Sequence, residues 1–151
     1  MQLLVVTATA AMLTLVVKPE FEAPDPAEQA RAAQIKLAEA LEYVGESKRR
    51  IGQSFTDSHS LPRTATEANA MKPATDQMPE FVQDVKFQHD YAGETVMIMV
   101  YLKHGVVDNV LGGEQYVYIA GIKSQDDAQT IEWQCGARNV DRTLLPENCR
   151  S

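Results

Sequence analysis

Histidine and cysteine, two residue types common in catalytic and metal sites, are scarce in this chain of 151 residues, which has three and two of them. The histidines His59, His89 and His104 match no metal-binding spacing, so we interpret them as surface or turn residues. No Gly-x-Ser-x-Gly, phosphate-binding loop or His-Glu-x-x-His motif occurs. Two cysteines without a neighbouring histidine or second cysteine pair do not make a zinc site. We therefore expect no enzyme activity, no cofactor and no metal.

Basic residues are also few: the chain has 14 Lys and Arg against 21 Asp and Glu, which gives a net charge of −7. This balance argues against binding nucleic acid through bulk electrostatics. A local basic cluster, Lys48-Arg49-Arg50, is better interpreted as a solvated helix face than as a DNA-binding stripe, because no aromatic stacking platform accompanies it. The apolar fraction of 44% is enough for a core, and the length is that of one domain.

The first 17 residues carry no charged side chain, and the run ends abruptly at Lys18. As a helix this run would span about 25 Å, less than the ~30 Å hydrocarbon layer of a bilayer. Three interpretations stay open: the apolar part of a signal peptide that lacks its basic region, a short membrane or filament-core helix, or a buried core helix. A proline-broken acidic linker, 18–26, follows it.

The next stretch, 27–55, is typical of one long amphipathic helix. Asp25-Pro26 supplies an N-cap and a first-turn proline, and Leu61-Pro62 ends the pattern. We expect the narrow apolar stripe to be covered by the second half of the chain. With one gap at Lys48, the stripe consists of Ala30, Ala33, Leu37, Leu41, Val44, Ile51 and Phe55.

A polar loop is expected over 56–79, after which the apolar period changes to two residues. In the first strand the predicted apolar face is Phe81, Val85 and Phe87, with Val82 on the polar face. The second strand is apolar on both faces, so we expect a central strand covered on both sides. The short connections favour an antiparallel meander, giving an α+β fold for the globular domain 18–151. The predicted strands are 81–88, 95–103, 115–122 and 130–135.

The two cysteines, Cys135 and Cys149, would pair in an exported protein and stay free in the cytosol. The apolar N-terminal run and the acidic composition favour export and hence the bridge. A disulfide here would close a loop of 149 − 135 + 1 = 15 residues. The chain-entropy model gives such a loop about 3 kcal/mol of stabilisation.

The C-terminal stretch resembles the type IVa pilins of Gram-negative bacteria. It consists of Trp133-Gln134-Cys135-Gly136, a short loop and then Leu145-Pro146-Glu147-Asn148-Cys149-Arg150. Two further segments are similar to that family: the helix from Glu28 to Leu41, and Gly113-Glu114 followed by a strand, a polar turn and Ile-x-Trp-x-Cys. The resemblance covers about 27–151.

The resemblance implies a structural subunit of a type IV pilus, active in adhesion, twitching motility or DNA uptake. Its N-terminal helix would anchor in the inner membrane and later pack against other pilin subunits in an extracellular filament. The disulfide loop would be exposed on the filament. A host surface and DNA would be further binding partners. The residues implied there are Arg138, Asn139, Asp141 and Arg142 in the loop, and Ser151 as an O-glycan site.

The N-terminal residues depart from the family pattern. A basic leader, a Gly-Phe cleavage site and an early glutamate do not occur, and the first acidic residue, Glu20, follows the apolar run. A start set too late, an altered N-terminus or a divergent subunit would each account for this. The alternative function is a minor pilin or pilin-like binding module that recognises DNA or a surface receptor, through Tyr116, Tyr118 and the basic helix cluster.

Overall fold

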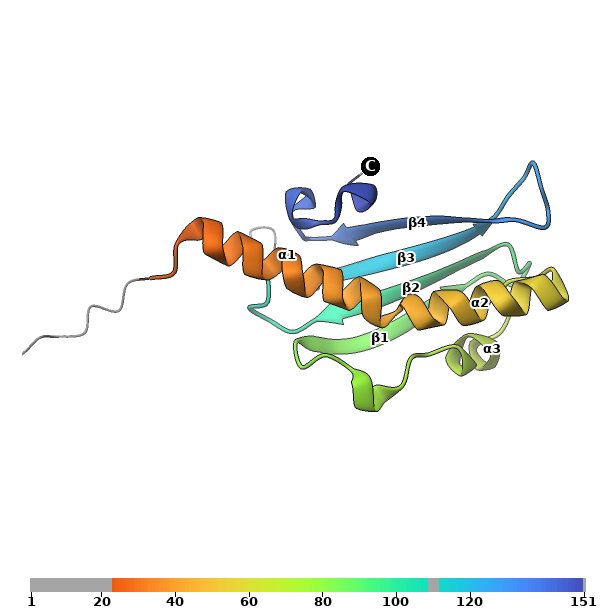
Figure 1. Ribbon diagram of the computed structural model, residues 1–151. Coiled ribbons are helices and arrows are strands. Elements are labelled where there is room, and N and C mark those ends of the chain that lie inside the picture. The colour runs from red at the N-terminus through yellow and green to blue at the C-terminus, as the bar shows by residue number, and fades with distance from the viewer. Residues whose placement is uncertain (1–22, 109–111, 151) are drawn as a thin grey trace, which may run out of the picture.

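Two helices that follow each other along the chain lie across one face of a four-stranded sheet (Figure 1). The computed structural model describes residues 23–108 and 112–150. Two layers, helix and sheet, make up the α+β fold that the sequence predicts. The elements are α1 (Pro26–Tyr43), α2 (Gly45–Ser58), α3 (Ala65–Ala70), β1 (Val82–His89), β2 (Thr95–Leu102), β3 (Tyr116–Lys123) and β4 (Ile131–Arg138).

The predicted long helix is confirmed, and it is bent at one residue. Asp25 caps its start, where the side-chain Oδ1 accepts from the backbone N–H of Ala27 at 3.1 Å. At Val44 the backbone leaves the helical range, with φ −90° and ψ 1°, and α2 begins directly after it. A β-branched residue followed by Gly45 is a weak helix-forming pair, which accounts for the position of the bend. His59, in the left-handed conformation at φ 55°, ends α2.

The bend changes which helix residues face the sheet. Leu41 and Ala30, expected in the apolar stripe, are only half-buried. The predicted gap at Lys48 is filled because the neighbouring Ser47 turns inward and is fully buried. The buried residues of α1, α2 and the bend between them are Ala33, Leu37, Ala40, Val44, Ser47, Ile51 and Phe55.

The sheet has the strand order β1-β2-β3-β4 with every pair antiparallel, as the short connections predict. Ile98 on β2 is paired with Ile119 on β3, and Ile119 is paired with Cys135 on β4. β4 continues to Arg138, beyond the predicted end at Cys135, because its last residues still pair with β3. The final strand thus reaches into the segment expected to be a loop.

Val82 does not lie on the polar face of β1, contrary to the alternation in the sequence. The pairing register of β1 and β2 shifts between Val82 and Asp84. The extra residue of this β-bulge puts Val82 and Val85 on the same side of the sheet. Both are buried, whereas Phe81 is half-buried beside the core.

The expectation that β2 is covered on both faces is wrong for the described residues. Its inward side chains, such as Val96 and Ile98, are buried against the helices. On the opposite face Met97, Met99 and Tyr101 are half-exposed. The described chain supplies only one helical layer, so one face of the sheet stays open to solvent (Figure 1).

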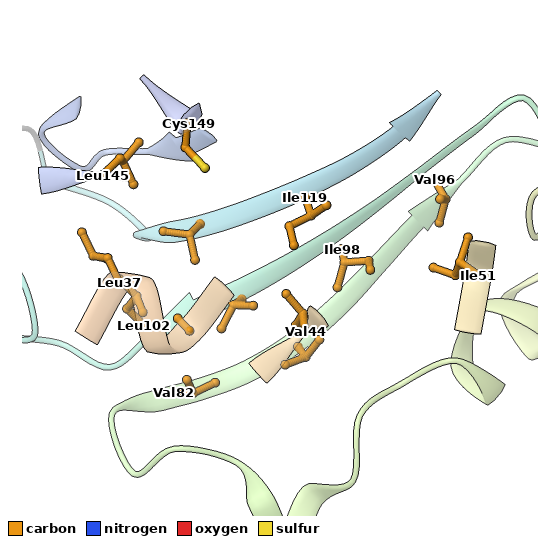
Figure 2. Close-up of a cluster of buried hydrophobic side chains, with 14 of the residues drawn as sticks. Leu37, Val44, Ile51, Val82, Val96, Ile98, Leu102, Ile119, Leu145 and Cys149 are labelled. Atoms are coloured by element: carbon orange, nitrogen blue, oxygen red, sulfur yellow. The ribbon is translucent and has the colours of Figure 1, made fainter. Parts of the chain in front are cut away.

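The core lies between the inner face of the sheet and the bent helix, as Figure 2 shows for Leu37, Val44 and Ile51. Leu145 and Cys149, which follow β4 in the chain, also reach this core and are 1% and 3% exposed. The C-terminal tail is therefore part of the folded domain.

The segment expected as a polar loop, 56–79, contains local structure. α2 runs on to Ser58, and α3 begins after Thr64, whose Oγ1 accepts from Glu67 N at 3.2 Å. The Glu67 side chain in turn accepts from the backbone N–H of Arg63 at 2.7 Å. These reciprocal hydrogen bonds resemble a capping box, which accounts for a helix in so polar a stretch.

Within the described ranges no helix is both long and apolar enough to cross a membrane. The apolar run 1–17 lies outside those ranges, so the three interpretations of it stay predictions.

Candidate functional site

The C-terminal tail is joined to the last strand by a disulfide between Cys135 and Cys149, whose Cα atoms are 4.8 Å apart. Cys149 lies in a one-turn 3₁₀ helix, η3 (Glu147–Cys149), which packs against β4. The predicted pairing is therefore confirmed. The bridge holds an irregular segment in place next to the edge of the sheet.

Asn139 forms the turn that leaves β4. Its φ is 55°, a left-handed conformation that asparagine tolerates better than most residues. Its Nδ2 donates to the carbonyl of Glu114 at 2.9 Å, and its own carbonyl accepts from Gln115 Nε2 at 2.8 Å. Gln115, the residue before β3, is 5% exposed, so this turn is hydrogen-bonded to a buried side chain.

Asp141 caps the second 3₁₀ helix of the tail, η2 (Arg142–Leu144). Its Oδ1 accepts from Thr143 N at 2.9 Å and from Thr143 Oγ1 at 2.8 Å. These two hydrogen bonds favour the ionised carboxylate and lower the pKa of Asp141. At the other end of the tail, Arg150 Nε donates to the carbonyl of Leu145 at 2.8 Å.

The four predicted loop residues thus divide into two groups. Asn139 and Asp141 hold the turn and the tail together, whereas Arg138 and Arg142 carry exposed side chains. Contact with a partner stays a prediction for all four. Ser151, the predicted O-glycan site, lies outside the described residues.

A groove of about 520 Å³ runs between α1, β4 and the disulfide. Its lining includes Leu41 and Trp133, and Lys48 Nζ lies 5.3 Å from the centroid of the Trp133 ring. A mainly apolar lining suits non-covalent binding, and the polar side chains in it are Glu42, Lys48, Gln134 and Asn148. The groove escaped the sequence analysis because its walls come from three distant segments. The only local signal was the Trp-x-Cys end of the last strand.

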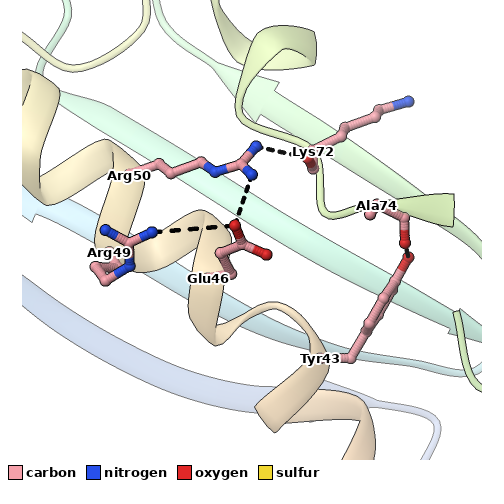
Figure 3. Close-up of polar contacts among 6 residues, drawn as sticks. All are labelled: Tyr43, Glu46, Arg49, Arg50, Lys72 and Ala74. Carbon is pink, nitrogen blue, oxygen red and sulfur yellow. Dashed lines mark hydrogen bonds and ion pairs between the residues drawn. The ribbon is translucent and has the colours of Figure 1, made fainter. Parts of the chain in front are cut away.

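The basic cluster on α2 is engaged within the domain (Figure 3). Arg50 Nη2 lies 2.6 Å from Glu46 Oε1, and its Nη1 donates to the carbonyl of Lys72 at 3.4 Å. Arg49 lies 4.0 Å from the same carboxylate oxygen of Glu46. Lys48 and Arg49 are exposed, as expected for a solvated face, and Arg50 in addition reaches across to the segment after α3.

Tyr43, the last residue of α1, holds the same segment about two helical turns before Arg50 (Figure 3). Its hydroxyl donates to the carbonyl of Ala74 at 3.0 Å. Burial, with the nearby charge of Asp76, raises the pKa of Tyr43. The phenol therefore stays protonated and keeps donating this hydrogen bond at neutral pH.

The three histidines lie on separate elements: His59 at the end of α2, His89 at the end of β1 and His104 after β2. No group of three or more metal-ligating side chains occurs among residues 23–108 and 112–150. Tyr116 and Tyr118 lie on the open face of the sheet, opposite the helices that carry Lys48-Arg49-Arg50. The tyrosines and the basic cluster, proposed together for DNA binding, therefore do not form one surface.

The comparisons with known proteins give one family match. No curated protein matches the chain. The family model of pilin, a bacterial filament protein, matches residues 30–150, which include α1 from its second turn onward, α2, α3, the sheet and the disulfide. The chain therefore belongs to the pilin family.

Proposed function

We propose that this chain is a structural subunit of a type IV pilus and acts by polymerising rather than by catalysis. One observation carries the proposal most strongly. The long bent helix packs along the inner face of a four-stranded sheet whose last strand is disulfide-bonded to the C-terminal tail. This arrangement agrees in element order with the resemblance found in the sequence, and the family model matches the residues that form it.

The apolar run 1–17 is the segment that would assemble. A helix that is apolar on all sides can lie in the inner membrane before assembly and among copies of itself afterwards. The small residues from Thr7 to Ala11 would let neighbouring helices approach closely. In the filament the subunit would be extracellular, with the disulfide loop and the open face of the sheet outward.

The surface role is proposed as adhesion, twitching motility or uptake of DNA. The groove beside the disulfide and the exposed side chains of Arg138 and Arg142 support a contact surface at this end of the domain. The same features suit the alternative, a minor pilin or pilin-like module that binds DNA or a receptor. The two alternatives differ in abundance within the filament.

Electron microscopy of the native host tests the filament role. Cells that lack the gene should lose filaments, and antibodies raised against the folded domain should label complemented filaments along their whole length. Label confined to the tip or base would favour the minor subunit. Unchanged filaments, twitching and adhesion in the deletion strain would overturn the structural role. Unchanged uptake of DNA in the same strain would overturn the DNA-binding alternative as well.

A matched pair of variants tests the role of the apolar run. Val5→Arg adds a charge to that run and should abolish filaments while the folded protein still accumulates. Asp126→Asn changes an exposed turn between β3 and β4 and should leave filaments normal. Normal filaments from Val5→Arg would mean that this run is not the assembling segment.

A further inference from the structure

The open face of the sheet carries three tyrosines on its two central strands. Tyr101 on β2 is paired with Tyr116 on β3, and their ring centroids are 5.0 Å apart. Tyr118 lies two positions further along β3, 6.4 Å from Tyr116 between centroids. All three are half-exposed, and we call Tyr101, Tyr116 and Tyr118 the tyrosine face.

The ring of Tyr118 lies against a glycine of the neighbouring strand. A Cβ atom on Gly136 would lie 2.7 Å from Tyr118 Oη and 2.8 Å from its Cζ. The end of the ring therefore occupies the space that a side chain at position 136 would need. Backed by β4 in this way, the ring can present its other side outward as a flat π surface.

Two cations flank the tyrosine face. Lys86 Nζ lies 4.4 Å from the centroid of the Tyr101 ring, and Arg138 is the cross-strand partner of Tyr116. In the described parts of the chain neither cation forms an ion pair. Two carboxylates, Asp84 and Glu132, share this side of the sheet, so the face is electrically balanced overall.

We propose that the tyrosine face binds single-stranded DNA, with bases stacked on the tyrosine rings and phosphates held by Lys86 and Arg138. Aromatic rings beside unpaired cations are the combination that binds single strands without sequence preference. A duplex hides the faces of its bases and would gain little from these rings. This inference rests on the DNA-binding role within the proposed function, for which it names the binding surface and the single-stranded form of the ligand, and it does not rest on filament assembly.

The net charge of −7 sets how this binding should depend on salt. Bulk attraction to a polyanion is absent, so stacking must supply most of the affinity. Two phosphate contacts on a single strand predict a slope of about −1.4 for log K against log salt. Affinity should therefore fall only about sevenfold between about 50 and 200 mM salt.

Fluorescence anisotropy of a dye-labelled oligothymidine, titrated with the full-length chain in neutral detergent, measures this binding. We expect saturable binding with the shallow salt slope and much weaker binding of a duplex of the same length. Tyr118→Leu keeps apolar bulk and removes the flat ring, so it should weaken binding about tenfold or more. Lys86→Gln should reduce the salt slope by about half.

Two control variants should bind like wild type. Tyr91→Leu alters a tyrosine that is 88% exposed and lies in the turn between β1 and β2, away from the tyrosine face. Arg49→Gln alters the basic cluster on α2. Circular dichroism melts of each variant confirm that the fold is kept.

Four outcomes would overturn the proposal: no binding at the lowest salt, equal binding of single strand and duplex, wild-type affinity in Tyr118→Leu, or a loss confined to Arg49→Gln. If Tyr118→Leu keeps its DNA affinity but loses filaments, the face is a contact between subunits. Filaments are scored by microscopy without DNA, so failure here leaves the pilus proposal separately testable.

Discussion

The indole ring of Trp133 lies over Gly121, its cross-strand partner on β3. A Cβ atom on Gly121 would lie 2.9 Å from Cζ3 and 3.0 Å from Cη2 of that ring. The same Cβ would lie 3.3 Å from Cγ2 of Ile131. The absence of a side chain at position 121 is therefore what lets the indole pack against the sheet.

Gly121→Ala should lower the free energy of unfolding by about 1–3 kcal/mol, because the added methyl overpacks this site. Gly52→Ala is the matched control, since a Cβ there meets no atom within 4 Å and the residue lies in a helix. It should raise stability by about 0.8–1 kcal/mol. Urea denaturation followed by fluorescence of the single tryptophan measures both. Equal stability of Gly121→Ala and wild type would contradict the packing argument.

Ser47 is fully buried, and its hydroxyl has no hydrogen-bond partner among the described residues. Replacing it by alanine removes a desolvated polar group and improves helix propensity. We expect Ser47→Ala to raise the free energy of unfolding by about 1 kcal/mol. Ser58→Ala is the control, because its Oγ donates to the carbonyl of Ser54 at 2.9 Å. A thermal midpoint of Ser47→Ala below that of wild type would mean that a water satisfies the hydroxyl.

Leu37 and Ile35 are two aliphatic residues of one helix with opposite environments. Leu37 is fully buried against the sheet, whereas Ile35 is 61% exposed. Leu37→Ala should cost about 2–5 kcal/mol of stability through lost burial and a cavity. Ile35→Ala should change stability by no more than about 0.5 kcal/mol. Chemical denaturation of the two variants compares them, and similar losses would mean that α1 packs on a different face.

Breaking the Cys135–Cys149 bridge should lower stability by about 3 kcal/mol in the chain-entropy model. Reductant added to the wild-type chain should therefore lower its thermal midpoint. The double variant Cys135→Ser and Cys149→Ser should start from the lower midpoint and show no response to reductant. If reductant leaves the wild-type midpoint unchanged, the bridge contributes no net stability.

Hydrogen bonds hold the pKa values of two turn carboxylates below their usual range. Asp127 accepts from Thr130 Oγ1 and from the backbone of Gln129, and Asp141 accepts from Thr143 in the same way. A lowered folded-state pKa gives stability that is present above the unfolded pKa of about 3.9 and is lost as pH falls through the folded value. We therefore expect these groups to leave the thermal midpoint unchanged near neutral pH. When the pH is lowered beyond about 4, the thermal midpoint should decrease. Asp127→Asn and Asp141→Asn should each reduce the decrease of the thermal midpoint at acidic pH. The same decrease in the variants as in wild type would contradict the lowered pKa values.

Local patterns in the sequence were enough to predict the order of elements. Alternating apolar residues and short connections predict an antiparallel meander, because each strand pairs with the next along the chain. Apolar residues three and four apart predict the helix that covers it. The two cysteines are close in sequence, and one of them ends a predicted strand, so their pairing could be foreseen on the chemistry of an exported chain.

Only the tertiary structure decided details that depend on distant segments. The bend at Val44 and the bulge after Val82 change which residues face the core, and Ser47 is buried where its own neighbours predict a polar gap. Pairing of strands puts Lys86 beside Tyr101 and Arg138 beside Tyr116. Periodicity reports which residues share a face, but it does not report what covers that face. The sequence therefore determined the helix, the sheet and their order, while packing in three dimensions decided which surfaces stay free to bind.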